Sequence, residues 1–145
     1  MDADVTSVES WEREEFRVPG LAEPISHYTD AVVAGPLVFI SGCAPVDSSG
    51  RLVGSDIRAQ ARQVHENLKL VLDATGSDFS RITKVVVYVT DMSEREAIDD
   101  VRREYFGSAR PASTLVEVAA LAIPGMRVEI EATAVRGTAA GADPT

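Results

Sequence analysis

Glu129 is a carboxylate set among apolar residues near the C-terminal end of the chain. It lies in residues 126–135, whose alternation of apolar and polar side chains predicts a strand. One face of that strand would be apolar, and the other would carry Arg127, Glu129, Glu131 and Thr133. A carboxyl group in such surroundings can act as a general base that activates water. The alternative is a structural ion pair with Arg127 on the same face, and the pattern alone leaves both interpretations open.

Three further charged residues of this region have competing interpretations. Glu131 shares the strand face of Glu129, and we interpret it as a structural residue or an ion-pair partner. Glu117 lies between apolar residues of another predicted strand, where capping a backbone group or contacting a second subunit is as plausible as catalysis. Arg110 precedes Pro111 in a loop, and its side chain either turns into a cleft or stays in solvent.

The cysteine and histidine residues argue against thiol and metal chemistry. Cys43 is the single cysteine, so no intramolecular disulfide can form and a reducing compartment is expected. A nucleophilic Cys43 would need a nearby base, which the sequence does not supply. His27 and His65 have no cysteine at metal-ligand spacing, so we expect no metal site. His65 falls beside the apolar stripe of a predicted helix, and we expect it at the surface or in a groove.

The composition of the 145 residues is that of a globular domain with an acidic surface. Hydrophobic residues make up 45% and charged residues 26%, which predicts one domain with a single core. The formal charge of −9 argues against a nucleic-acid binder, because basic surfaces supply most of that affinity. No apolar run approaches the roughly 20 residues of a membrane span, and the acidic start lacks a signal-peptide pattern. We expect a soluble cytoplasmic protein.

The elements that must position these residues follow from periodicity and turn signals. Residues 1–10 and 137–145 are expected to be flexible, and residues 11–136 to form the single domain. Strands are predicted at 11–18, 30–34, 37–41, 82–90, 114–120 and 126–135, and a helix from 55 or 56 to 75. A capping box of Ser93 and Glu96 would open a second helix, which Gly107 would end. The order β-β-β-α-β-α-β-β predicts an α+β fold, a mixed sheet with two helices on one face.

Two helices on one side leave the other face of such a sheet uncovered. The strands contribute the apolar residues Leu115, Val116, Val118, Val128 and Ile130, which is more apolar surface than two helices would cover. Self-association is the usual way to bury so large a patch. The sequence therefore favours a homo-oligomer.

Short segments along the chain form an ordered set. They read SHYTDAV (26–32), LVFISG (37–42), AQARQVHENL (59–68), KVVVYVTD (84–91), YF (105–106), PA (111–112), VEVA (116–119) and VEIEA (128–132). In this order they resemble the Rid (reactive intermediate deaminase, or YjgF-like) family over residues 22–136. No single segment is decisive, but the ordered set is specific.

The resemblance implies a fold, an assembly and an activity. The fold is chorismate-mutase-like, and three subunits form a homotrimer whose sheets close into a central barrel with the helices outside. Small molecules bind in clefts between neighbouring subunits. Family members with known activity hydrolyse reactive enamines and imines to 2-oxo acids and ammonia, and they use no metal or organic cofactor.

The resemblance also implies site residues, position by position. Glu129 matches the glutamate that handles water, Tyr28 matches a tyrosine that reaches into the cleft, and Gly42 matches a backbone position near the ligand. Leu115 stands where a cysteine is common, a position that offers mainly backbone and bulk. Ser113 stands where deaminases of the best-known branch carry an arginine that clamps the substrate carboxylate in a bidentate fork.

The serine at position 113 changes the expected substrate. A hydroxyl donates one hydrogen bond but cannot neutralise a carboxylate, and losing the charged pair would weaken binding roughly ten- to hundredfold. Arg110 is one candidate replacement, and Asp99, where the family often has asparagine, is a second departure. We therefore expect a deaminase whose imine or enamine substrate lacks a free α-carboxylate. The alternatives are a pathway-specific deaminase of an aminomuconate-like or biosynthetic intermediate, and a non-catalytic trimer that binds a small ligand.

Overall fold

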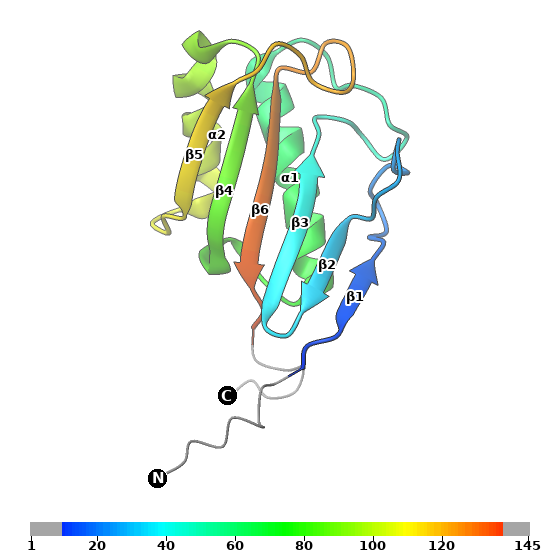
Figure 1. Ribbon diagram of the computed structural model, residues 1–145. Coiled ribbons are helices and arrows are strands. Elements are labelled where there is room, and N and C mark those ends of the chain that lie inside the picture. The colour runs from blue at the N-terminus through cyan, green and yellow to red at the C-terminus, as the bar shows by residue number, and fades with distance from the viewer. Residues whose placement is uncertain (1–9, 138–145) are drawn as a thin grey trace.

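The protein folds into a six-stranded mixed sheet with both α-helices packed on one face (Figure 1). The structure is a computed structural model that describes residues 10–137. The strands run in the order β1-β2-β3-β6-β4-β5. Their bounds are β1 Arg13–Phe16, β2 Ala31–Ala34, β3 Leu37–Cys43, β4 Ile82–Val89, β5 Ala112–Glu117 and β6 Val128–Val135, and the helices are α1 Ile57–Thr75 and α2 Arg95–Phe106. The α+β architecture and the element order are those predicted. The expectations for the two chain ends fall almost wholly outside the described residues.

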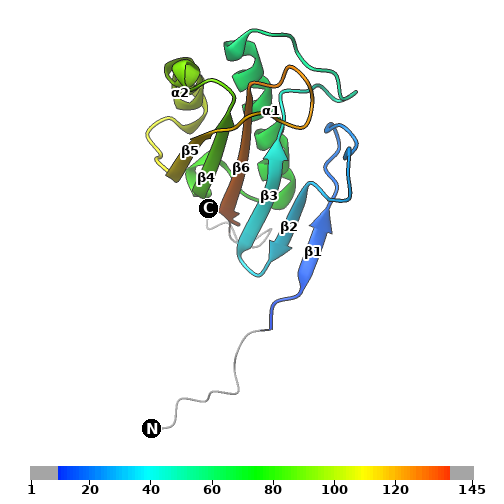
Figure 2. The same ribbon diagram turned by 45° about the horizontal axis from the view of Figure 1, so that its top comes forward.

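The long helix α1 is set by its caps and its apolar stripe. The Asp56 carboxylate accepts a hydrogen bond from the Ala59 amide at 3.0 Å, and Gly76, with φ 78°, ends the helix through its N–H to the Leu72 carbonyl. One face of α1 packs on the sheet through residues with at most 1% exposure, namely Ala61, Val64, Leu68, Val71 and Leu72. In a second view both helices again lie behind the sheet (Figure 2).

The second helix begins differently from the prediction. Asp91 caps a short 3₁₀ turn, Met92–Glu94, by accepting hydrogen bonds from the Ser93 amide at 2.9 Å and the Ser93 hydroxyl at 2.6 Å. The Ser93 hydroxyl is therefore already engaged, and α2 starts at Arg95 without a side-chain cap. The predicted capping box was wrong because the aspartate two residues earlier holds the serine. Gly107 ends the helix as predicted.

His65 is a core residue rather than the surface or groove residue that was expected. Its side chain is fully buried, its Nδ1 lies 2.7 Å from the Ala61 carbonyl oxygen, and its ring stacks on Tyr105 at a centroid distance of 5.0 Å. Phe79 and Phe106 complete this aromatic cluster. The helix pattern placed His65 at the margin of the α1 stripe, and the rings of α2 and of the loop before β4 cover that margin.

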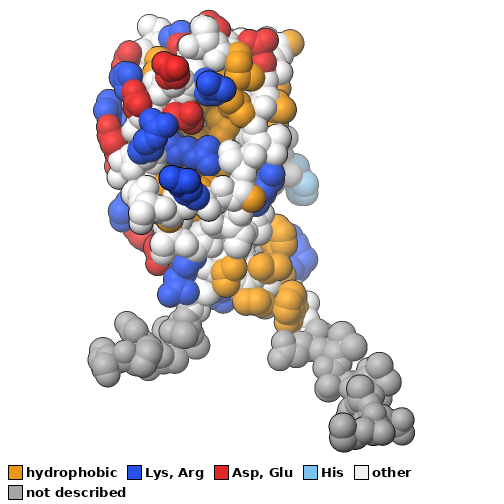
Figure 3. All heavy atoms as spheres, turned by 90° about the vertical axis from the view of Figure 1, so that its left-hand side faces the viewer, with side chains coloured by type: hydrophobic (Ala, Val, Ile, Leu, Met, Phe, Trp, Pro, Cys, Tyr) orange, Lys and Arg blue, Asp and Glu red, His pale blue; other side chains and the backbone are white. Residues whose placement is uncertain are grey.

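Two features of the sheet shape the functional surface. The antiparallel pairing of β3 with β6 is interrupted between Ile40 and Cys43, and β5 runs parallel to β4 from Ala112 to Glu117. Strand β5 thus begins two residues before the predicted strand and includes Ser113. The side of the molecule formed by α2 and β5 carries a group of Lys and Arg side chains beside an apolar patch (Figure 3).

The face of the sheet opposite the helices is less apolar than predicted. Val128 and Ile130 point into the core, with exposures of 0% and 1%, so they add nothing to the open face. The alternate residues of β6 that face away from the core include Glu129 and Glu131, and Phe39 of β3 is 46% exposed. The period-2 pattern of β6 is as predicted, but its apolar residues pack in the core and so do not belong to the surplus apolar surface that was expected. The homotrimer stays a prediction.

Candidate functional site

A cavity of about 360 Å³ brings together three of the predicted site residues, Tyr28, Gly42 and Glu129. Glu129 comes from β6, Gly42 from β3, and Tyr28 from the segment before β2. The Ser41 hydroxyl, next to Gly42, donates a 2.6 Å hydrogen bond to the Thr29 carbonyl, which holds the Tyr28 segment against β3. Tyr28 is 47% exposed. The cavity is therefore assembled from segments far apart in the sequence.

The absence of a side chain at Gly42 makes room for the Glu129 carboxyl group. A Cβ atom at position 42 would lie 2.6 Å from Glu129 Oε1 and 2.8 Å from Glu129 Cδ, closer than real Cβ contacts. The interruption of the β3–β6 pairing falls at this point. Gly42 is thus required by close approach, because any larger residue would displace the carboxyl group.

The Glu129 carboxyl group is half-buried and free to accept a proton. Burial, and next the negative charge of Glu131, raise the pKa of Glu129 above its ordinary value of 4.5. Within residues 10–137 no donor forms a hydrogen bond to Glu129, whereas Glu131 accepts one from the Tyr88 hydroxyl. A carboxylate with a raised pKa and unoccupied lone pairs, facing a cavity, can orient a water molecule and take its proton.

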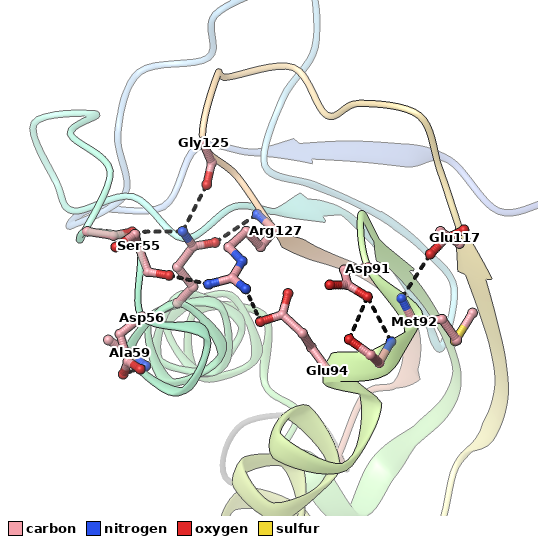
Figure 4. A network of polar contacts seen from close by, with 12 residues as sticks. Ser55, Asp56, Ala59, Asp91, Met92, Glu94, Glu117, Gly125 and Arg127 are labelled. Carbon is pink, nitrogen blue, oxygen red and sulfur yellow. Dashed lines mark hydrogen bonds and ion pairs between the residues drawn. The ribbon is translucent and has the colours of Figure 1, made fainter.

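Arg127 does not pair with Glu129, which removes the structural alternative for that glutamate. Its guanidinium pairs instead with Glu94, at the turn before α2, and also donates to the Ser55 carbonyl, at the start of α1 (Figure 4). The Arg127 amide donates to Gln60 Oε1 at 2.8 Å. These contacts fix Arg127, the residue directly before β6, and so fix the start of the strand that carries Glu129.

Glu117 takes the backbone-capping role that was one of its predicted alternatives. Its carboxylate accepts a 2.9 Å hydrogen bond from the Met92 amide, and Figure 4 shows the two residues facing each other across the end of the sheet. Glu131 is likewise engaged, with the Tyr88 hydroxyl. Of the three glutamates considered from the sequence, Glu129 is the one whose carboxyl group remains available.

Cys43 lines the same cavity, but its thiol is not expected to be reactive. The thiol is 6% exposed, and burial, followed by the charges of Glu129 and Asp30, raises its pKa to about 12. The thiolate is the reactive form of cysteine. A thiol with this pKa stays protonated at neutral pH, so Cys43 shapes the cavity wall.

The other three predicted site residues lie on a different surface of the chain. Ser113 and Leu115 line a cavity of about 210 Å³ between α2 and strands β4 and β5. Arg110 is exposed and lines an adjacent hollow of about 450 Å³ at the C-terminal end of α2. Neither hollow includes Glu129. Within one chain the six candidates thus form two separate groups.

Arg102 of α2 also belongs to this surface, although it was not among the predicted site residues. Its Nη1 donates a 3.1 Å hydrogen bond to the Ser113 hydroxyl, and it lines both hollows of the α2 side. Helical spacing was the available signal, because positions 95, 98, 102 and 106 share one face of a helix. The missing information was that this face packs beside Ser113.

None of the helices between residues 10 and 137 combines the length and the apolar character that a bilayer span requires. No cluster of three or more His, Cys, Asp or Glu side chains with metal-binding geometry occurs between residues 10 and 137.

Known proteins similar to this chain point to one family. A family model described as Endoribonuclease L-PSP matches residues 20–136. A RutC family protein from Pyrococcus horikoshii is 42% identical over 113 residues, covering 77% of this chain and 89% of that protein. The 2-iminobutanoate/2-iminopropanoate deaminase of Homo sapiens is 35% identical over 122 residues, covering 83% and 86%. The crystal structure of E. coli TdcF with bound serine has a TM-score of 0.77 at 31% identity, covering 85% of this chain and 100% of that one.

Proposed function

The chain belongs to the endoribonuclease L-PSP family, also called the Rid or YjgF-like family, and from this premise we propose that it is an imine or enamine deaminase. The observation that carries the proposal is the Glu129 carboxyl group, which is half-buried, raised in pKa and free of hydrogen bonds from residues 10–137. A deaminase from this family at 35% identity supports the reaction class.

The proposed reaction is a hydrolysis. Glu129 orients a water molecule and accepts its proton as the oxygen attacks the carbon of the C=N bond. That proton then passes to the substrate nitrogen, which gives a carbinolamine. A second transfer through Glu129 moves the hydroxyl proton of the carbinolamine to the nitrogen as the C–N bond breaks, so ammonia leaves and a carbonyl compound remains. An enamine substrate enters the same route after its carbon gains a proton and its nitrogen loses one, which gives the imine. Water is the only co-reactant, and no redox step is involved.

We place the complete site between two subunits of a homotrimer. The Glu129 group (Tyr28, Gly42 and Glu129) and the α2-side group (Ser113 and Leu115) lie on separate surfaces of one chain. Apposition of one subunit's Glu129 group with the next subunit's α2-side group would join the water-activating carboxyl to a small apolar cavity. The exposed Tyr28 and Phe39 side chains, at 47% and 46%, would be covered by the same assembly.

Endoribonuclease activity does not fit the charge of this chain. The formal charge of −9 would repel a phosphate backbone, whereas nucleic-acid binding depends on basic surfaces.

The proposal is tested by ammonia release from 2-iminopropanoate generated in situ by an amino-acid oxidase, with and without the protein. We expect acceleration by the wild type and none by Glu129→Gln, which keeps the size of the side chain but cannot take a proton. Glu96→Gln is the matched control, because its side chain is exposed and lies outside the Glu129 cavity. Equal rates for the wild type and Glu129→Gln would rule out the role of Glu129. Inactivity of the wild type, with retained ligand binding, would favour a non-catalytic binding protein.

A further inference from the structure

A guanidinium group occupies the space beside Ser113. Arg102 Nη1 donates to the Ser113 hydroxyl at 3.1 Å, and the guanidinium carbon lies 5.5 Å from the centroid of the Phe106 ring. The side chain is half-buried between α2 and β5. One contact is a hydrogen bond and the other is a cation–π interaction. Together they hold the positive charge of Arg102 next to Ser113 of β5, whose own side chain offers only a hydroxyl group.

Arg102 has spare hydrogen-bonding capacity and no anionic partner in the described chain. Three other arginines of the two helices are paired, Arg103 and Arg58 with Asp100 at 3.1 and 3.0 Å and Arg62 with Glu104 at 3.1 Å. Arg95, which also lines the small cavity, is exposed. Arg102 forms no such ion pair with any residue between 10 and 137, although Asp99 lies near enough to act on it as a charge. A guanidinium offers five N–H donors in a planar fork, and Ser113 accepts one. Burial lowers the pKa of Arg102, and the nearby negative charge of Asp99 offsets this effect only in part.

The cavity next to this guanidinium has the walls and size for a small organic acid. Val87, Ile98 and Leu115 supply apolar walls, and Arg95, Asp99, Arg102 and Ser113 supply the polar groups. Its volume of about 210 Å³ is smaller than the roughly 300–1,000 Å³ of pockets for drug-sized ligands. The surrounding surface presents Lys and Arg side chains next to apolar ones (Figure 3).

We propose that Arg102, supplied by helix α2, binds the carboxylate of the substrate, so that this site accepts small 2-imino and 2-oxo acids although the strand position carries Ser113. Two N–H groups of the fork would bind the two carboxylate oxygens, and the Ser113 hydroxyl would fix the orientation of the guanidinium. The inference rests on the proposed deaminase function and replaces the expectation that the substrate lacks a free α-carboxylate. It also removes the need for Arg110, which lies in the neighbouring hollow.

The test is a binding titration of the full chain with pyruvate and, in parallel, with its neutral amide. We expect Arg102→Gln to weaken pyruvate binding about ten- to hundredfold, and to leave binding of the amide unchanged. Arg103→Gln is the matched control, because it is the next residue of the same helix and its side chain is exposed and paired with Asp100. The double variant Arg102→Gln with Ser113→Arg should recover pyruvate binding, because the charge returns from the strand.

Each other outcome overturns the inference. The inference fails if Arg102→Gln binds pyruvate as tightly as the wild type does. It also fails if the wild type binds pyruvate and the amide equally, or does not bind pyruvate. Ammonia release from 2-iminopropanoate separates this failure from a failure of the proposed function. Turnover that Arg102→Gln leaves unchanged would keep the deaminase and refute the anion site. Arg102-dependent pyruvate binding without turnover would keep the anion site and refute the deaminase.

Discussion

Gly42→Ala is predicted to reduce turnover strongly and to reduce stability little. The added Cβ would lie 2.6 Å from Glu129 Oε1, and ordinary contacts begin at 3.4 Å, so the carboxyl group must retreat by about 0.8 Å. A displacement of about 1 Å at a reacting group can cost roughly a hundredfold in rate, so we expect kcat to fall about ten- to hundredfold. The free energy of unfolding should fall by no more than about 1 kcal/mol, because the Glu129 side chain is flexible and half-exposed.

A double-mutant cycle identifies the cause of that loss. The unfolding free energy is measured by urea titration for the wild type, Gly42→Ala, Glu129→Ala and the double variant. Any destabilisation by Gly42→Ala should disappear in the Glu129→Ala background, because the clashing atoms are gone. An unchanged kcat in Gly42→Ala, or the same destabilisation in both backgrounds, would refute the close-approach argument.

Three further predictions concern stability and reactivity. Burial holds the pKa of His65 in the folded protein below its ordinary value of 6.5, so the unfolded chain binds a proton at His65 more readily. Neutral His65 therefore contributes to stability above pH 6.5, and this contribution is lost as the pH falls through the folded-state pKa. Urea titrations at pH 7.5 and 5.0 should therefore show a larger loss for the wild type than for His65→Phe, and equal losses would contradict this. Cys43, with a pKa of about 12 and 6% exposure, should resist iodoacetamide at pH 7.5 and react fully in urea; rapid modification of the folded protein would count against a buried thiol. Glu94→Ala should lower the unfolding free energy by about 1.5 kcal/mol, because Arg127 loses its charged partner but stays partly exposed and bonded to the Ser55 carbonyl. The exposed Glu96→Ala should change it by less than about 0.5 kcal/mol.

Local patterns predicted most of the fold because they determine which face of each element is buried. Apolar residues recur at three- and four-residue spacing in α1 (Ala61, Val64, Leu68), and β4 contains a β-branched run (Val85 to Val87), and the structure buries one face of each element. Errors arose where a nearby side chain competed for the same group, as Asp91 does for Ser93 at the start of α2. A capping pattern cannot reveal which of two local acceptors holds a hydroxyl.

The candidate site was less predictable, because its partners come from distant segments. The resemblance supplied Glu129 and Gly42, and the geometry supplies the reason that they belong together. One of two alternatives paired Arg127 with Glu129 on the same strand, but its partner is Glu94, at the turn before α2. Arg102 and Ser113 are in contact because α2 packs beside β5. The residues around each of them in the sequence do not predict that packing. Periodicity can place a side chain on a face, but it does not say what covers that face.

The central claim is that Glu129 takes a proton from the attacking water. Its most direct test is the pH dependence of enzyme-catalysed 2-iminopropanoate hydrolysis, measured for the wild type and Glu129→Gln. A base must be deprotonated to act, so the wild-type rate should rise with pH to a plateau, with its midpoint above 4.5 because the pKa of Glu129 is raised. Glu129→Gln should show neither the plateau rate nor that pH dependence. A wild-type rate and profile in Glu129→Gln would contradict the account.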